Sequence, residues 1–260
     1  FPSVVDVAGV NRVSRVVYTN AGAAICAMAR ADNRANESAR PLLAVTMFGD
    51  TTRAVGNARA FLEAAGYEVL VFHATGAGGR TMESLIASGF FVGVLDMTTT
   101  EWADELCGGV LSAGPDRLDA AAQAGIPQVV VPGCLDMCNF WAPETIPAQY
   151  RDRLFYHWNP NVTLMRTSAE EMAQLGAIFA RKLNAARAPV VVMIPAGGFS
   201  EVDVPGGPFW SPQADQAFVD ALRRDLHPEI PVIVREEEIN APDFSAATAH
   251  ALLDLLTRSE

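Results

Sequence analysis

The stretch LLAVTMFGDTTRAVGNARAFLEAAGYEVLVFHATGAGGRTME, residues 42–83, decides the fold that we expect for this chain. It contains two apolar runs, and each leads through a small polar turn into a helical pattern. This order predicts a β-α-β-loop-α unit. Such turns present free backbone N–H groups at a helix N-terminus, where an anion is favoured.

The same alternation continues along the rest of the chain. Further apolar runs lie at residues 90–96, 128–132, 190–195 and 231–236, with helical patterns between them. Because these runs are apolar throughout, both of their faces are expected to be buried. The pattern predicts an α/β fold with a doubly wound, mostly parallel sheet and helices on both faces, similar to a Rossmann fold.

Two parts of the chain differ from this rhythm. Residues 1–40 hold an alanine-rich helical pattern from Asn11 to Arg30, and they are predicted to form an N-terminal helical extension to a Rossmann-like domain of residues 41–260. Residues 133–165 are rich in aromatic residues and proline and lack clear periodicity. A segment of this kind is typical of a loop that packs over a site or a partner.

Composition excludes several classes of protein. Half of the 260 residues are hydrophobic, and the formal net charge is −11. This charge disfavours nucleic acid and anionic membranes as partners, and no apolar run is long enough to span a bilayer. The four cysteines are scattered and lack a neighbouring histidine cluster, which predicts free thiols in a reducing cytoplasm and no metal site.

Small, hydroxylated or ionisable residues follow nearly every predicted strand. In an open α/β sheet, ligands bind outside the carboxyl ends of the strands, so these residues are expected to line a crevice for a small-molecule ligand. The predicted ligand- and cofactor-binding residues are Gly49, Asp50, Thr51, Thr52, Thr75, Gly76, Gly78, Gly79, Thr98, Thr99, Arg166, Gly197, Gly198 and Ser200.

The turn at residues 75–80 is the strongest of these signals. Its glycines allow a nest of amides to face a phosphate or carboxylate, although it matches neither a Walker A loop nor a dinucleotide fingerprint. A tight strand-to-helix connection without a ligand explains it as well. Asp50 can cap the next helix or hold Mg²⁺ when a nucleotide is bound. Arg166 can clamp an anion or form an ion pair with nearby acidic residues.

Three residues at predicted strand exits are candidate catalytic groups. His73, Asp96 and Cys134 can serve as acid, base or nucleophile in an enzyme that acts on a small carboxylate or acyl substrate. Structural roles, a hydrogen-bonded packing histidine for His73 and a buried thiol for Cys134, are the more common explanation of such residues. The sequence leaves open whether the chain is an enzyme. A protein-interaction module that uses the aromatic residues 140–158 is a third hypothesis.

Several stretches together resemble one known family. They include PSVVDVAGVNR (2–12), VTMFGDTTRAVGNAR (45–59), FHATGAGGRTME (72–83) and QVVVPGCLDMCN (128–139). The chain resembles the C-terminal domain of the Tm-one-like ATP-binding proteins, a family with plant and bacterial members. The resemblance implies ATP as the ligand and leaves open which of the family's two domains binds it. The glycine-rich turns by themselves predict ATP or another phosphate-bearing ligand, with Mg²⁺ as an option at Asp50. The resemblance also implies a preceding α/β domain in the same protein, which fits a chain that opens with Phe, and a homo-oligomer with the helix at residues 11–30 in its interface.

Overall fold

The computed structural model describes residues 1–2, 9–31 and 40–258. The chain divides into two compact units, residues 1–39 and residues 40–260. Among the residues described, no helix has both the length and the apolar character needed to cross a membrane.

Helix α1 (Arg12–Arg30) is the only element described in the first unit. It begins with a capping box, in which the Asn11 side chain accepts hydrogen bonds from the amides of Val13 and Ser14. The Ser14 hydroxyl accepts from the Asn11 amide in return. Such reciprocal bonds satisfy N–H groups that a helix start otherwise leaves without partners.

The second unit is built on a six-stranded sheet in the order β2-β1-β3-β4-β8-β9, and every neighbouring pair is parallel. The predicted doubly wound α/β fold is therefore confirmed. The strands are β1 (Leu42–Met47), β2 (Glu68–His73), β3 (Gly93–Thr98), β4 (Gln128–Gly133), β8 (Val190–Pro195) and β9 (Val232–Arg235).

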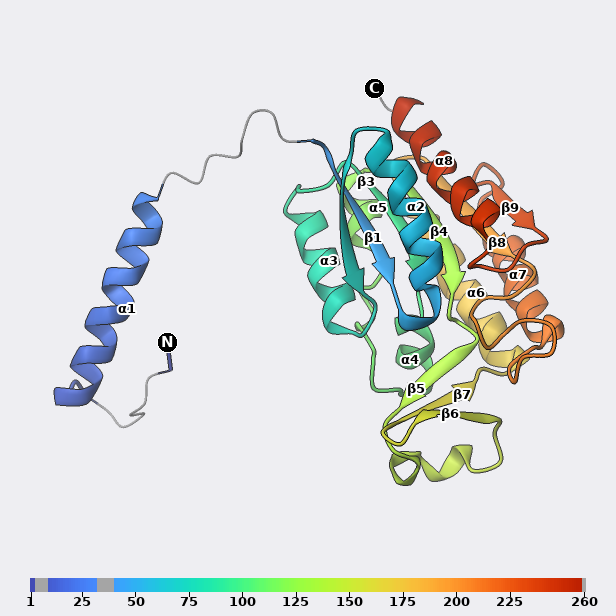
Figure 1. Cartoon of the computed structure of the whole chain (residues 1–260), viewed down its shortest axis with the longest axis horizontal. Helices are drawn as coiled ribbons and strands as arrows, with labels where there is room; N and C mark the ends of the chain where they lie inside the picture. The colour runs from blue at the N-terminus through green and yellow to red at the C-terminus, as the bar shows by residue number, and fades with distance from the viewer. Residues whose placement is uncertain (3–8, 32–39, 259–260) are drawn as a thin grey trace. The chain divides into compact units, whose positions relative to one another are not determined.

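Successive residues of the central strands enter different cores, as expected for strands that are apolar throughout. Leu43 and Val45 of β1 pack against α2 (Thr52–Ala64) and α8 (Pro242–Arg258), which lie together on one face of the sheet (Figure 1). Ala44 of β1 packs toward the other face. The helices of that second face are α3 (Ala77–Ala87), α5 (Ala120–Ala124), α6 (Ala169–Leu183) and α7 (Pro212–Asp225).

The segment predicted to be irregular folds into a second, antiparallel sheet in the order β5-β7-β6. Its elements are β5 (Met137–Phe140), the short 3-10 turns η2 (Pro143–Thr145) and η3 (Ala148–Tyr150), β6 (Phe155–Asn159) and β7 (Val162–Arg166). Local periodicity does not reveal these strands, because they are short and β5 pairs with β7 across the whole segment. Figure 1 shows this small sheet beyond the carboxyl ends of the main strands.

The strand order reverses between β1 and β3. The chain runs from β1 to β2 on one side and then returns to β3 on the other side of β1. At such a reversal the two connections diverge and leave a crevice at the carboxyl ends of the strands, where ligands of open α/β sheets bind. The small sheet lies at this end of the second unit.

Candidate functional site

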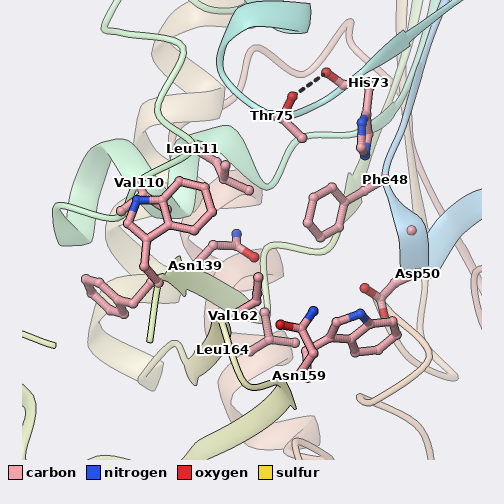
Figure 2. Close-up of a pocket in the computed structure, with 14 residues that line it drawn as sticks. Phe48, Asp50, His73, Thr75, Val110, Leu111, Asn139, Asn159, Val162 and Leu164 are labelled. Carbon is pink, nitrogen blue, oxygen red and sulfur yellow. Dashed lines mark hydrogen bonds between the residues drawn. The ribbon is translucent and has the colours of Figure 1, made fainter. Parts of the chain in front are cut away.

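A cavity of about 520 Å³ lies where the β1 and β2 exits face the small sheet (Figure 2). This volume is within the range of small-molecule sites. The lining residues come from the two strand exits, from the loop after α4 (Glu101–Cys107) and from the small sheet and the residues next to it. They are Phe48, Gly49, Asp50, His73, Thr75, Val110, Leu111, Asn139, Phe140, Trp141, Trp158, Asn159, Val162 and Leu164.

Aromatic and aliphatic side chains make up most of the cavity wall. The rings of Phe48 and His73 have centroids 5.7 Å apart and together form one side. Trp141 and Trp158 line the cavity as well, and both are exposed. No lysine or arginine is among these lining residues. The cavity therefore offers ring faces to a planar ligand but no cation to a phosphate.

Asp50 is a buried acid with an unused hydrogen-bond acceptor. It lies in the 3-10 turn η1 (Gly49–Thr51), and its Oδ1 has no partner among the residues that the structure describes. Burial, and then the charge of Glu201, raise the pKa of Asp50 to about 6. Asn240 holds the turn in place, because its Nδ2 donates to the Asp50 carbonyl oxygen at 2.7 Å. A buried carboxylate without a counter-ion is a functional-site candidate.

Asn139 of β5 supplies a second unused acceptor. Its Nδ2 donates to Oδ2 of Asp104 at 2.7 Å, and its backbone N–H donates to Oδ1 of Asp104 at 3.1 Å. The Asn139 Oδ1 atom is buried and has no partner within the described part of the chain. Burial raises the pKa of Asp104 to about 7, although the hydrogen bonds from Asn139 oppose this shift.

The glycine-rich turn binds a carboxylate that belongs to the chain itself. The amides of Gly76 and Gly79 both donate to Oε1 of Glu101, at 2.7 and 3.1 Å. A Cβ atom at Gly79 would lie 2.2 Å from Oε2 of Glu101, and one at Gly78 would lie 1.8 Å from the His73 carbonyl oxygen. Close packing thus accounts for both glycines. The position predicted for a ligand anion is occupied by Glu101, and none of these three glycines lines the cavity.

Asp96 belongs to an ion-pair network around Arg117. This arginine is almost completely buried and donates to both carboxylate oxygens of Asp96 at 2.6 Å and to Oε2 of Glu101 at 2.7 Å. Although burial opposes it, the charges of Asp96, Glu101 and Glu83 raise the pKa of Arg117 well above its usual value. Thr46 donates to Asp96 as well. With its oxygens engaged in this way, Asp96 is a structural partner here and does not line the cavity.

The predicted threonines have hydrogen-bond partners in the protein. Thr51 and Thr98 join their hydroxyls at 2.7 Å, which ties the exits of β1 and β3 together. The hydroxyl of Thr99 donates to the Val131 carbonyl at 3.0 Å, and that of Thr52 donates to the Gly49 carbonyl at 2.9 Å. These hydrogen bonds hold the strand exits together and support the first turn of α2. Of the predicted threonines, only Thr75 lines the cavity.

Cys134 follows β4 and is buried away from the cavity lining. It has a left-handed backbone with φ of 58°, and its amide donates to the Phe199 carbonyl at 2.9 Å. Burial, and next the charge of Asp50, raise the pKa of its thiol well above the usual value. A thiol in this environment stays protonated, which makes it a poor nucleophile.

Arg166 is neutralised by carboxylates of its own chain. Its Nη2 donates to Oδ1 of Asp215 at 2.6 Å, and its Nε donates to the Phe209 carbonyl at 2.8 Å. The hydroxyl of Ser200 nearby donates to Oδ2 of Asp136 at 2.7 Å. This cluster lies at the β4 and β8 exits, outside the cavity lining.

Gly197 and Gly198 connect the β8 exit to the chain after β9. The Gly197 amide donates to the Glu237 carbonyl at 3.1 Å, and the Gly198 amide donates to the Pro195 carbonyl at 3.0 Å. Gly198 has a φ of 138°, and a Cβ atom there would lie 1.8 Å from the Asp203 carbonyl oxygen. Both glycines therefore serve close packing of backbone on backbone.

The structure thus brings four of the predicted residues into one cavity: Gly49, Asp50, His73 and Thr75. Sequence reasoning missed Asn139 and Asp104. Asn139 lies in a segment without periodicity, so nothing placed it beside a strand exit. Asp104 is buried in the short helix α4, and only the contact with Asn139 distinguishes it from an ordinary acidic helix residue. Among the described residues, no group of three or more His, Cys, Asp or Glu side chains can hold a metal ion.

The comparisons with known proteins cover the whole chain. Residues 40–256 match the model of the "Uncharacterised protein family (UPF0261) C-terminal domain", and residues 1–34 match the model of the N-terminal domain of the same family. These matches assign α1 and the α/β unit to two different domain models.

Similar proteins occur in bacteria and in a plant. A UPF0261 protein of Clostridium tetani is 45% identical over 257 residues, which are 98% of this chain and 64% of the relative. One of Rhizobium meliloti is 47% identical over 262 residues, with the same coverage. The tomato (Solanum lycopersicum) protein "ToMV resistance protein Tm-1(GCR237)" is 41% identical over an alignment of 266 positions, which covers all of this chain and 35% of the relative. This chain therefore spans a little under two thirds of the bacterial relatives.

Proposed function

The chain belongs to the UPF0261 family, and we propose that its α/β unit binds a nucleotide, with the nucleoside part in the cavity beneath the small sheet. The observation that carries this proposal is a pair of buried acceptors, Asp50 Oδ1 and Asn139 Oδ1, which belong to residues lining one cavity and have no partners among the described residues. Buried polar groups are nearly always hydrogen-bonded, so such atoms point to a ligand that donates to them.

The shape of the cavity supports the same proposal. Its volume of about 520 Å³ suits a nucleoside-sized group, and Phe48, Trp141 and Trp158 provide ring faces for stacking on a base. A carboxylate such as Asp50 is a common partner for ribose hydroxyls in α/β folds. These features favour the nucleoside part as the main source of affinity.

The phosphate part of the ligand is expected to contribute less. Glu101 fills the glycine-rich turn, and no lysine or arginine lines the cavity. We therefore propose that phosphates lie toward solvent. The Mg²⁺ that accompanies ATP is then expected to bind the phosphates, while the ribose hydroxyls engage Asp50.

Isothermal titration calorimetry tests the proposal with adenosine, AMP, ATP with Mg²⁺, and inorganic phosphate. We expect the three adenine compounds to bind within about tenfold of one another and phosphate alone to give no heat. Trp158→Ala is expected to weaken binding about tenfold, because base stacking contributes roughly 1–3 kcal/mol. Trp210→Ala is the matched control, since Trp210 does not line this cavity. Absence of heat with all three adenine compounds, or equal losses in both variants, would contradict the proposal.

A second function, an enzyme that acts on a small carboxylate or acyl substrate, is favoured by one observation. His73 and Asp50 line the same cavity, and the pKa of Asp50, about 6, suits acid-base chemistry near neutral pH. Asp96 and Cys134 were candidates for the same chemistry, but their partners and burial favour structural roles. Turnover of acyl substrates by the full chain, lost in His73→Ala, would support this function, and undiminished turnover in the variant would exclude His73 as its catalytic group.

The proposed partners rest on α1 and on the length of the relatives. The match of residues 1–34 to the N-terminal domain model supports a preceding domain in the same protein. Helix α1 exposes Val13, Val16, Ile25 and Met28, and such apolar side chains favour burial in a further interface. We propose a homo-oligomer in which α1 takes part in that interface.

A further inference from the structure

The orientation of the Asn139 amide is determined by its neighbours. Asp104 carries a carboxylate that accepts hydrogen bonds from the Asn139 side chain and from the backbone amides of Asn139 and Leu111. The Asn139 Nδ2 also donates to the Thr100 hydroxyl at 3.3 Å. An ionised carboxylate only accepts hydrogen bonds, so the Asn139 NH₂ group must face it and the carbonyl oxygen must face the other way.

The other side of Asn139 is the cavity. In Figure 2 the Asn139 amide projects into it, with Val110 and Leu111 to one side and Val162 and Leu164 to the other. Because these four neighbours are aliphatic, they cannot satisfy the Oδ1 atom. The cavity wall is therefore apolar and carries a single acceptor at this point. The donor that this oxygen lacks is therefore an N–H or O–H group from outside the described residues, of a ligand or a water.

We propose that the cavity selects a flat heteroaromatic ligand whose exocyclic amino group donates to Asn139 Oδ1, and that Asp104 is the positioning residue that imposes this choice. The inference rests on the proposed nucleoside site and deepens it. An amino group donates a hydrogen bond to Asn139 Oδ1. A ring carbonyl at the same place only accepts, so two oxygen atoms would face each other without a hydrogen bond between them. A buried acceptor without a donor is costly, so the discrimination is expected to be strong.

Asp50 adds to the same preference from the strand-exit side of the cavity. Its Oδ1 also lacks a partner within the described residues, and it lies next to the start of α2 rather than among aliphatic side chains. Hydroxyl groups of a sugar can donate there, and they bind an acceptor equally well in all common nucleosides. Asp50 thus favours a nucleoside in general, while Asn139 distinguishes the base.

Two matched pairs of nucleosides test the proposal by calorimetry on the full chain. Adenosine and cytidine carry an exocyclic amino group, and inosine and uridine carry a carbonyl in its place. The titrations are run at pH 8, where both Asp104 and Asp50 are ionised. We expect the amino member of at least one pair to bind about tenfold or more tightly than its carbonyl counterpart.

The variant Asp104→Asn gives the decisive comparison. The introduced amide keeps one acceptor for the backbone amides but replaces Oδ2 with an NH₂ group. That group donates, so the Asn139 amide is expected to turn and present its own NH₂ to the cavity. The preference should then invert toward inosine or uridine. Asp220→Asn, an exposed change on α7, is the matched control and should retain the preference of the unmodified chain.

Each outcome decides a separate point. Binding of both members of each pair with equal affinity, or an unchanged preference in Asp104→Asn, overturns the inference and leaves the proposed function standing. Failure of all four nucleosides to bind overturns both. If circular dichroism shows that Asp104→Asn does not fold, Asn139→Leu replaces it, and adenosine should then lose its advantage over inosine. A purely structural role for Asp104 lowers all four affinities together and does not invert their order.

Discussion

At the scale of single residues, Asp50 is expected to lower the stability of the free protein and is proposed to contact the ligand. Its carboxylate is buried, lacks a counter-ion and keeps Oδ1 without a partner among the described residues. A hydrogen bond from the Asn240 side chain to the Asp50 carbonyl oxygen nevertheless fixes the position of this residue. Groups that destabilise the free protein in this way are typical of binding sites, because a ligand supplies the missing interaction.

Asp50→Asn is expected to stabilise the free protein at neutral pH. The folded-state pKa, about 6, lies above the ordinary value of 3.8, so folding disfavours the ionised form. The cost is absent below pH 3.8, grows as the pH rises, and is complete above pH 6. Removing the charge should add about 2 kcal/mol to the free energy of unfolding at roughly pH 7.5 and close to nothing at about pH 4.

Urea unfolding at these two pH values checks the expectation for Asp50→Asn. Asp220→Asn serves as the exposed control and should change stability equally little at both. A gain that is the same at both pH values, or a loss of stability at the higher one, would show that the Asp50 carboxylate is not an uncompensated buried charge.

At the scale of elements, the glycine-rich turn between β2 and α3 connects helices α3 and α4 to the main sheet. Its amides hold Glu101, and Glu101 in turn binds Arg117, which pairs with Asp96 at the carboxyl end of β3. The anion that a nest of amides favours is therefore supplied by α4. This arrangement connects α3, α4 and the sheet beneath the cavity, and it explains why the turn needs glycine without a ligand.

Gly78→Ala should destabilise the protein strongly. The new Cβ atom would lie 1.8 Å from the His73 carbonyl oxygen, and backbone at that place cannot move without disturbing β2. We expect a loss of about 3 kcal/mol or more in the free energy of unfolding. Gly56→Ala is the matched control, because Gly56 lies in α2 and a Cβ atom there meets nothing within 4 Å.

The control substitution has an expected sign of its own. Alanine favours the helix more than glycine does, so Gly56→Ala should raise the free energy of unfolding by about 0.5–1 kcal/mol. Denaturant titrations followed by circular dichroism measure both variants. Equal stability of the two would mean that the turn at Gly78 has room that the structure does not show.

At the scale of the whole molecule, the hydrophobic clusters found among the described residues belong to the second unit. The five buried clusters draw all their members from residues 42–256, on both faces of the main sheet and beneath the small one. The large clusters are those expected of a doubly wound sheet.

A fragment of residues 40–260 is therefore expected to fold by itself. Its thermal unfolding should be cooperative, and its free energy of unfolding should lie within about 1 kcal/mol of that of the same unit in the full chain. Circular dichroism and differential scanning calorimetry compare the two. A fragment that aggregates or melts without a cooperative transition would show that residues 1–39 contribute to the core.

Local sequence patterns determine much of this protein. Apolar strands such as Leu42–Met47, each followed by a small polar turn and a helix, encode a parallel sheet covered on both faces, because burial and periodicity act over a few residues and crossovers have one hand. The same logic placed the site at the carboxyl ends of the strands, and Gly49, Asp50, His73 and Thr75 do line the cavity there.

Only the tertiary structure decided which groups line the cavity. Glu101 reaches Gly76 from 25 positions away, and Asp104 orients Asn139 from 35 positions away. Neither contact leaves a periodic trace in the sequence, since each depends on how separate elements pack. The glycine-rich turn at residues 75–80 binds the Glu101 carboxylate of the same chain. Asn139, from a segment without periodicity, lines the cavity and has an unpaired acceptor among the described residues. Local propensity sets the elements, whereas contacts between distant residues set the chemistry.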